Sequence, residues 1–369
     1  MPQPSELIPL LQLIVRNSSV QFADVAAGDA RGQQLRFVYT RQDPSGVILD
    51  SPDGTDALRD RRYLIASITK PVVAMLAVKL AAAGQLSLNE PVRNFLDGFH
   101  RGPLRSITIR NLLTHTSGLP DMLPNNTELR QQHATLADFV IHTAAVTPEF
   151  TPGTDCRYSS MGIAVLGEIL ERIRATPLAN LLHEEFFAPL GMTGTWLGLP
   201  RDRSSELSST VVPCELPPWQ DPQSDWNWNS DYWRTLGAPW GGMISSADDL
   251  GRLSEAILRE QSGDVDDGVL NKAAITACVS NQTRHMSGLS EADRLQRPWG
   301  FGWRLNWPDH ATCFSDFLPK SAFGHWGATG TMLWIDRRSS RWCVILTNQP
   351  YETSQTVIQR MSNLIASSL

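Results

Sequence analysis

The sequence predicts an α+β fold that combines one antiparallel sheet with a mostly helical lobe. Strand-like segments occur near both ends of the chain, and helical patterns fill the region between them. The simplest architecture pairs the terminal strands in one sheet, flanked by terminal helices. A length of 369 residues suits two lobes. We expect residues 1–80 and 240–369 to form the lobe with the sheet, residues 81–239 to form the helical lobe, and an active site to lie between them.

The first elements along the chain are a helix and two strands. Apolar residues between 7 and 15, interrupted by Pro9 and Gln12, indicate an amphipathic helix packed on the fold rather than a membrane anchor. Strands are expected at residues 35–40 and 46–49, joined by a turn of Asp, Pro, Ser and Gly. A helix over residues 70–83 is then closed by Gly84.

Later segments are helical until the C-terminal hairpin. Spaced apolar residues predict helices that include 140–145 and 163–173, and another over 246–259. Strands at 331–336 and 341–347 enclose a tight hairpin, and a final helix covers about 354–365. Residues 219–240 are rich in tryptophan. They either wall an apolar pocket or pack beneath a long loop.

Composition excludes several classes of partner. A net charge of −6 and a pI near 5.8 argue against nucleic acid. We see no signal peptide and no apolar run long enough to span a bilayer, so we expect a cytoplasmic protein without a membrane partner. Five widely spaced cysteines without a CxxC pair favour reduced thiols. The sequence supports no metal, since His183-Glu184-Glu185 lacks the second histidine of HExxH, and it supports no cofactor; oligomeric state is not indicated.

Ser67 and Lys70 form the first chemical motif, Ser-Ile-Thr-Lys. If a helix starts at Ser67, residues three apart share a face, so the lysine amine can reach the serine hydroxyl. Burial and the helix N-terminus both disfavour the ammonium and lower the pKa of the lysine, so Lys70 could accept the serine proton. Alone, this short motif also fits an ordinary surface helix start.

Two further segments supply the remaining chemistry. Tyr158, just before an apolar helix, could point into a cleft between the lobes, or be a packed aromatic with a satisfied hydroxyl. The glycine-rich segment from Phe323 to Gly330 precedes a predicted strand and could be a simple turn. Glycines on an edge strand also let a substrate approach the backbone closely, so an N–H there could join that of Ser67 in an oxyanion hole.

The ordered combination of these motifs resembles the serine β-lactamase and penicillin-binding-protein superfamily. The branch that contains class C β-lactamases, family VIII esterases and D-aminopeptidases is the most similar. The resemblance covers nearly the whole chain and includes three further segments: GQLSLNEPV at 84–92, IRNLLTHTSGLP at 109–120 and GGMISSADDL at 241–250. It implies a β-lactamase/transpeptidase-like fold and a serine hydrolase that acts on a small ester or amide through an acyl-enzyme.

The resemblance also implies roles for single residues. Ser67 is the expected nucleophile, Lys70 the base or proton shuttle, and Tyr158 a second base in acylation and deacylation. The backbone N–H groups of Ser67 and Ala328 are expected to form the oxyanion hole. His115 is expected to pack or cap a turn rather than to react.

Two departures from the family pattern concern substrate binding. Ser160 stands where the family's tyrosine motif usually ends in Asn, so recognition of an acyl amide should weaken. His325-Trp326-Gly327 stands where penicillin-recognising members have Lys-Thr-Gly, which binds a substrate carboxylate. Losing such charge-assisted bonds costs roughly 1.5–3 kcal/mol each. Both departures favour uncharged substrates.

Three functions remain open at this stage. The first is an esterase-like serine hydrolase of small or medium esters. The second is a hydrolase of D-amino-acid amides, D-amino-acid peptides or β-lactams, against which Ser160 and Trp326 count. The third is a non-catalytic binding protein that retains the fold, against which the intact Ser67, Lys70 and Tyr158 count.

Overall fold

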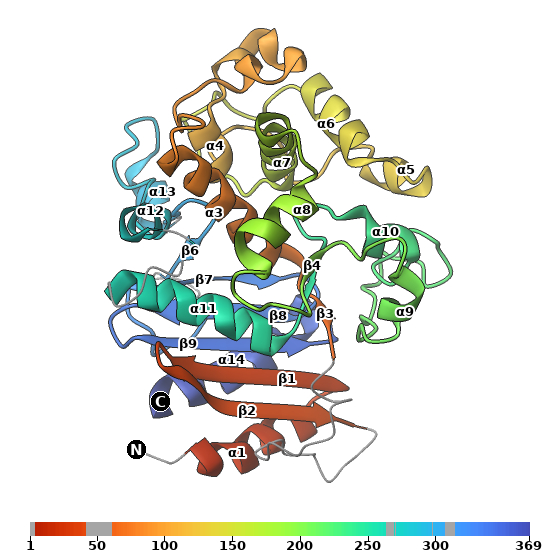
Figure 1. Cartoon of the computed structure of the whole chain (residues 1–369), viewed down its shortest axis with the longest axis vertical. Helices are drawn as coiled ribbons and strands as arrows, with labels where there is room; N and C mark the ends of the chain where they lie inside the picture. Colours follow the sequence, from red (N-terminus) through yellow and green to blue (C-terminus); the bar gives the residue numbers. More distant parts are fainter. Residues whose placement is uncertain (1–3, 42–60, 263–268, 270, 297, 307–313) are drawn as a thin grey trace.

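The computed structural model describes residues 4–41, 61–262, 269, 271–296, 298–306 and 314–369 (Figure 1). Its main feature is a six-stranded antiparallel sheet in the order β2-β1-β9-β8-β7-β6. The strands are β1 (Phe22–Asp29), β2 (Gly32–Thr40), β6 (Arg304–Leu305), β7 (Ala322–Gly327), β8 (Thr331–Asp336) and β9 (Arg341–Thr347). Strands from the two chain ends meet where β1 pairs with β9, which confirms the antiparallel sheet expected from the sequence.

The two faces of the sheet bury different helices. Along β9, Val344 and Leu346 face the core that is shared with α11 (Ala247–Ser262), whereas Cys343 and Ile345 face the opposite core. That second core is formed with α1 (Pro4–Arg16) and α14 (Tyr351–Ser368), the terminal helices. Figure 1 shows α11 across one face and α14 behind the sheet. Alternation along each strand therefore produces a sheet that is covered on both sides.

Strand β1 was not predicted, and its composition explains why. The sequence FADVAAGD contains no alternation of apolar and polar residues, since Ala23 to Gly28 are all buried. Alanine, glycine and aspartate also have low strand propensity. Asp24 is fully buried and forms an ion pair with Arg36 of β2, which also reaches Asp248 at the start of α11 at 2.8 Å. A buried charge thus occupies the interior of this strand.

Helices form the other part of the molecule, drawn above the sheet in Figure 1. Its centre is α3 (Thr69–Ala82), whose residues 69–78 are all buried, as expected for a helix that is apolar on every side. The surrounding helices are α4 (Ile109–Leu113), α5 (Asn126–Gln131), α6 (Leu136–Ala145), α7 (Ser160–Arg174), α8 (Leu178–Leu182), α12 (Lys272–Cys278) and α13 (Glu291–Gln296). The 3₁₀ segments are η1 (Ala66–Ile68), η2 (Val92–Asn94), η3 (Asp97–His100) and η4 (Gly102–Ser106), and η5 (His183–Phe187) is a π-helical turn.

A small second sheet connects the two parts. Its order is β3-β5-β4, with β3 (Tyr63–Leu64), β4 (Trp196–Leu197) and β5 (Met243–Ser245). β3 leads directly into η1 and α3, the segment that contains the Ser-x-x-Lys motif. Two short helices, α9 (Ser204–Ser208) and α10 (Asp231–Leu236), lie in the tryptophan-rich region or close to it.

The other sequence-based expectations have mixed outcomes. The amphipathic N-terminal helix, the strand at 35–40, the hairpin at 331–347 and the C-terminal helix are confirmed. The strand expected at 46–49 lies outside the described residues. The division into residues 1–80 with 240–369 and residues 81–239 stays a prediction. Cys156, Cys214, Cys278 and Cys343 are buried free thiols.

None of the helices in the described ranges is both long enough and apolar enough to cross a bilayer.

The buried ion pair of β1 leads to a stability prediction. Asp24→Ala leaves the Arg36 guanidinium with the partly exposed Asp248 in place of its buried carboxylate, so we expect a loss of about 1.5–3 kcal/mol in the free energy of unfolding. Urea denaturation measures it. Arg172→Ala removes a more exposed ion pair with Glu168 and should change stability by only about 0.5 kcal/mol. Equal losses in the two variants would contradict the role given to Asp24.

Candidate active site

Ser67 lies in a tight turn between β3 and α3. The preceding residue, Ala66, has φ +47°, a left-handed conformation that is uncommon for a residue with a Cβ. The turn is held in place by Thr69, whose hydroxyl donates to Ala66 O at 2.7 Å and accepts from Met243 N at 3.1 Å. Strain that is held by such contacts is typical of functional sites. The turn places Ser67 in the wall of a cavity.

Lys70 is the group that can activate this serine. Its Nζ lies 2.9 Å from Ser67 Oγ and donates to Trp240 O at 2.6 Å. The side chain is buried, and burial lowers the pKa of Lys70 to about 7, although the nearby Asp121 carboxylate acts in the opposite direction. An amine with this pKa is largely neutral just above pH 7, so its lone pair can accept a proton from the serine hydroxyl.

Tyr158 lies above the same pair. Lys70 Nζ is 4.7 Å from the centre of its ring, and both Tyr158 and Ser67 line the same cavity. The adjacent Ser159 caps α7 by accepting from Gly162 N at 2.9 Å, which fixes the backbone beside the tyrosine. Burial raises the pKa of Tyr158 well above its usual value of 10, so the phenol keeps its proton at neutral pH.

His115 and Trp299 hold the tyrosine ring from behind. His115 is fully buried, its Nδ1 accepts from Ser159 N at 3.2 Å, and its ring lies 4.8 Å from that of Tyr158. Trp299 stacks on Tyr158 at 5.8 Å. Burial lowers the pKa of His115 well below its usual value, so it stays neutral. These contacts are those of a packing residue, as expected for His115 from the sequence.

His325 is buried beneath the site. Its Nδ1 lies 2.7 Å from Trp326 O, and since a carbonyl can only accept, Nδ1 carries the proton. Nε2 is then the acceptor of a hydrogen bond from the Tyr158 hydroxyl, at 3.5 Å. Burial lowers the pKa of His325 to about 3, so this position carries no positive charge at neutral pH.

The turn after β7 is brought close to Ser67 by a glycine and two threonines. A Cβ on Gly327 would lie 2.3 Å from Ile65 O, so only glycine permits this approach. Thr331 donates to Ile65 O at 3.0 Å, and Thr329 donates to Leu64 O. Ala328 consequently reaches the wall of the cavity that contains Ser67. Ala328 and Ser67 thus line the same cavity, and the oxyanion hole expected from their two N–H groups stays a prediction.

Ser160 is paired with a residue that the sequence did not suggest. Its hydroxyl donates to Asp121 Oδ1 at 2.6 Å, and its N–H donates to the same oxygen at 3.0 Å. The Ser160 proton is thus engaged within the protein rather than offered to a substrate. Asp121 directly follows the HTSGLP segment, and this position was the one signal that could have identified it.

The Ser67 cavity has a volume of about 420 Å³, which suits a small or medium ligand. Tryptophans make up much of its wall: Trp219, Trp228, Trp233, Trp240 and Trp326. Four of these five come from residues 219–240, which supports the pocket-wall interpretation of that segment. Trp326 is half-buried in the wall, whereas His325 and Gly327 are buried behind it.

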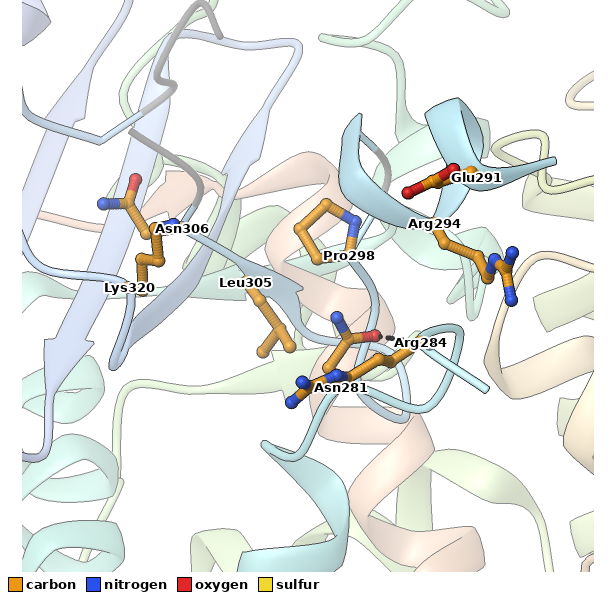
Figure 2. A pocket seen from close by; sticks show the side chains of 8 residues that line it. All are labelled: Asn281, Arg284, Glu291, Arg294, Pro298, Leu305, Asn306 and Lys320. Atoms are coloured by element: carbon orange, nitrogen blue, oxygen red, sulfur yellow. Dashed lines mark hydrogen bonds between the residues drawn. The ribbon is translucent and has the colours of Figure 1, made fainter. Parts of the chain in front are cut away.

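A second cavity, of about 630 Å³, lies elsewhere on the molecule (Figure 2). Among the described residues, its wall shares none with the Ser67 cavity and contains Asn281, Arg284, Glu291, Arg294, Pro298, Leu305, Asn306 and Lys320. None of these described residues is a serine, cysteine or threonine. Within the described ranges, no group of three His, Cys, Asp or Glu residues is placed to hold a metal ion.

Comparison with known proteins agrees with this geometry. Residues 17–366 match the family model described as Beta-lactamase. A penicillin-binding protein 4 from Amycolatopsis lactamdurans is 29% identical over 291 residues, covering 78% of this chain and 71% of that protein. Esterase EstB from Burkholderia gladioli is 27% identical over 337 residues, covering 83% and 82%, respectively.

Solved structures show the same fold. A penicillin-binding-protein homologue from Caulobacter crescentus superposes with a TM-score of 0.76 at 20% identity, covering 100% of this chain and 98% of that one. The hydrolase EstCE1, described as having promiscuous acyltransferase activity, gives a TM-score of 0.74 at 17% identity, with 98% of both chains covered. Because the family match spans nearly the whole sequence, this protein belongs to the β-lactamase and penicillin-binding-protein family of serine hydrolases.

Proposed function

We propose that this chain hydrolyses small or medium esters through an acyl-enzyme on Ser67. The observation that carries the ester preference is the neutral, buried His325 on β7, at the position where penicillin-recognising relatives have a lysine. Without that cation, the strand offers no charge-assisted bond to a carboxylate next to the scissile bond. The likeness to esterase EstB at 27% identity is consistent with this choice, although a penicillin-binding protein is similarly close.

Acylation begins with proton transfer from Ser67 to the neutral Lys70 amine. The Ser67 oxygen then forms a bond to the ester carbonyl carbon, and the carbonyl oxygen takes the negative charge. The N–H groups of Ser67 and Ala328 donate to this oxyanion. Collapse of the tetrahedral intermediate breaks the bond to the alcohol oxygen.

Tyr158 completes the proton transfer because it keeps its proton at neutral pH. Its hydroxyl donates to the leaving alkoxide and is reprotonated by the Lys70 ammonium. Deacylation repeats these steps with water: Lys70, through Tyr158, takes a proton from the water, which attacks the acyl carbon. The bond between the acyl carbon and the Ser67 oxygen then breaks, and this oxygen takes the proton back from the Lys70 ammonium.

The first prediction concerns the nucleophile. We expect Ser67→Ala to abolish labelling by a fluorophosphonate and to lower kcat for p-nitrophenyl butyrate by at least about a thousandfold, as for other catalytic serines. Intact mass spectrometry and p-nitrophenol release measure the two effects. Ser106→Ala changes an exposed serine outside the site and should leave both unchanged. A Ser67→Ala protein that still turned over the ester would mean that another residue is the nucleophile.

The second prediction is the pH dependence. Since Lys70 must be neutral to accept a proton, kcat/KM for a neutral ester should rise as the pH passes about 7 and then level off. In Asp121→Asn the carboxylate that raises the pKa of Lys70 is gone, so the rise should move to lower pH. Asn retains an oxygen acceptor for Ser160.

The matched control for Asp121→Asn is Glu149→Gln, an exposed carboxylate paired with Arg157. Its pH profile should coincide with that of the wild type. A profile that did not move in Asp121→Asn, or that moved to higher pH, would exclude Lys70 as the titrating base.

The third prediction compares substrate classes. Because His325 and Trp326 replace the carboxylate-binding pair, kcat/KM for a chromogenic cephalosporin should lie roughly one to two decades below that for p-nitrophenyl butyrate. Steady-state kinetics with both substrates on one preparation tests this. Faster cephalosporin turnover would favour a β-lactamase or a hydrolase of D-amino-acid peptides.

A further inference from the structure

Arg130 is a buried cation in the wall of the Ser67 cavity. It belongs to α5, and only 4% of its surface is exposed. Its Nε and Nη1 are enclosed by protein and find no hydrogen-bond partner in the part of the chain that the structure describes. Buried guanidinium groups are normally paired, because an uncompensated charge away from water is costly.

The surroundings of Arg130 compensate this charge only in part. The guanidinium lies 4.0 Å above the ring of Trp233, a cation–π contact worth about 0.5–2 kcal/mol. No carboxylate within the described ranges forms an ion pair with it. Burial lowers the pKa of Arg130 to about 10, so the group is still charged at neutral pH. A full positive charge is therefore available to the cavity.

Neighbouring groups in the same wall have free donors as well. The indole N–H groups of Trp233 and Trp240 find no acceptor among the described residues. The side-chain oxygen of Asn126, one turn before Arg130 on α5, is the one acceptor of this wall that is likewise unpaired among them. Donors thus outnumber acceptors around this part of the cavity. Buried polar groups without partners in a ligand cavity indicate what the ligand supplies, in this case acceptor oxygens with negative charge.

We propose that Arg130 forms an anion subsite of the Ser67 cavity, and that the substrate is an ester that carries a carboxylate away from its scissile bond. This inference rests on the proposed ester hydrolysis and specifies its substrate class. It also revises the uncharged substrates expected from the sequence. The cation is absent from the β7 side, where His325 lies, and present on the α5 side.

Charges elsewhere in the cavity limit where the carboxylate can lie. Asp121 and Glu352 also line the wall, and Asp121 acts on Lys70 and Ser160, next to the reacting atoms. A carboxylate close to the scissile bond would be repelled there. In this proposal the anionic end of the substrate lies at Arg130, and the tryptophan walls enclose the apolar chain between the two ends.

The test compares esters that differ only in this charge. One arm uses mono-p-nitrophenyl adipate and its methyl-capped ester, which place the carboxylate in the acyl half. The other arm uses 4-carboxyphenyl hexanoate and its methyl ester, which place it in the alcohol half. In one arm, kcat/KM for the charged ester should exceed that for the capped ester at least tenfold.

Arg130→Met keeps the apolar stem over Trp233 and removes the charge. We expect it to lower the charged-to-capped ratio by about tenfold to a hundredfold, the effect of one charge-assisted hydrogen bond. Arg110→Met is the matched control, because Arg110 also stacks on an aromatic ring, Phe301 at 5.2 Å, and does not line the cavity. Its ratio should equal that of the wild type.

Two results would overturn the subsite. One is a wild-type ratio near one in both arms. The other is a loss in Arg130→Met that is equal for charged and capped esters, because Arg130 would then serve only the fold. If Arg130→Met does not fold, Arg130→Lys replaces it in the test. Lysine lacks the planar guanidinium, so the charged-to-capped ratio of kcat/KM must fall at least about threefold. An unchanged ratio in Arg130→Lys contradicts the proposal.

Binding to Ser67→Ala separates this proposal from the proposed function. Quenching of tryptophan fluorescence by monomethyl adipate and by 4-carboxyphenyl hexanoate reports occupancy without turnover. If the wild type hydrolyses none of the esters, the esterase proposal fails. Binding that is lost in the Ser67→Ala/Arg130→Met double variant would still support the subsite, and no binding to Ser67→Ala would overturn it.

Discussion

The burial of the Lys70 amine beside the Ser67 hydroxyl is the constraint on which the rest of the site depends. Lys70 can act as a base near pH 7 only while α3, Trp240 and the Tyr158 ring keep water from its Nζ. The buried first turns of α3 are the structural requirement for this, because a helix whose residues 69–78 lie in the core carries its first-turn lysine into the core too. The fold therefore sets the chemistry by excluding solvent at one atom, and the hydrogen bonds around that atom keep its geometry fixed.

Two parts of the fold with different electrostatic character line the cavity that contains Ser67. The sheet contributes β7 and its following turn, which approach Ser67 through Gly327 and carry a neutral imidazole. The helical part contributes Asp121 and Arg130, charges that relatives' β7 motif does not encode. A family member that loses the strand lysine has thus lost one anchor for anions, and in this chain a cation on another element faces the same cavity.

The contacts within sequence motifs could be predicted from the sequence, whereas features that depend on packing between distant segments could not. The spacing of Ser67 and Lys70 predicts their contact, since it follows from helix geometry, and the hairpin at 331–347 follows from alternating residues. Strand β1 was not predicted, because aspartate and alanine are uncommon in strands. Its Asp24 can be buried there because it pairs with Arg36 on the next strand. Arg130 could not be identified, because an arginine on a polar six-residue helix is typical of a surface, and only packing shows that it is buried.

The left-handed Ala66 has a further consequence. A residue with a Cβ loses roughly 1–2 kcal/mol in this conformation, so the turn that presents Ser67 would relax if the surrounding contacts released it. Thr69, Thr329 and Thr331 hold it from three directions, through bonds to Ala66, Leu64 and Ile65. Ser67 thus follows a strained backbone that hydroxyl groups of three threonines keep in place. A substitution of any of these threonines would misalign Ser67 although Ser67, Lys70 and Tyr158 themselves are unchanged.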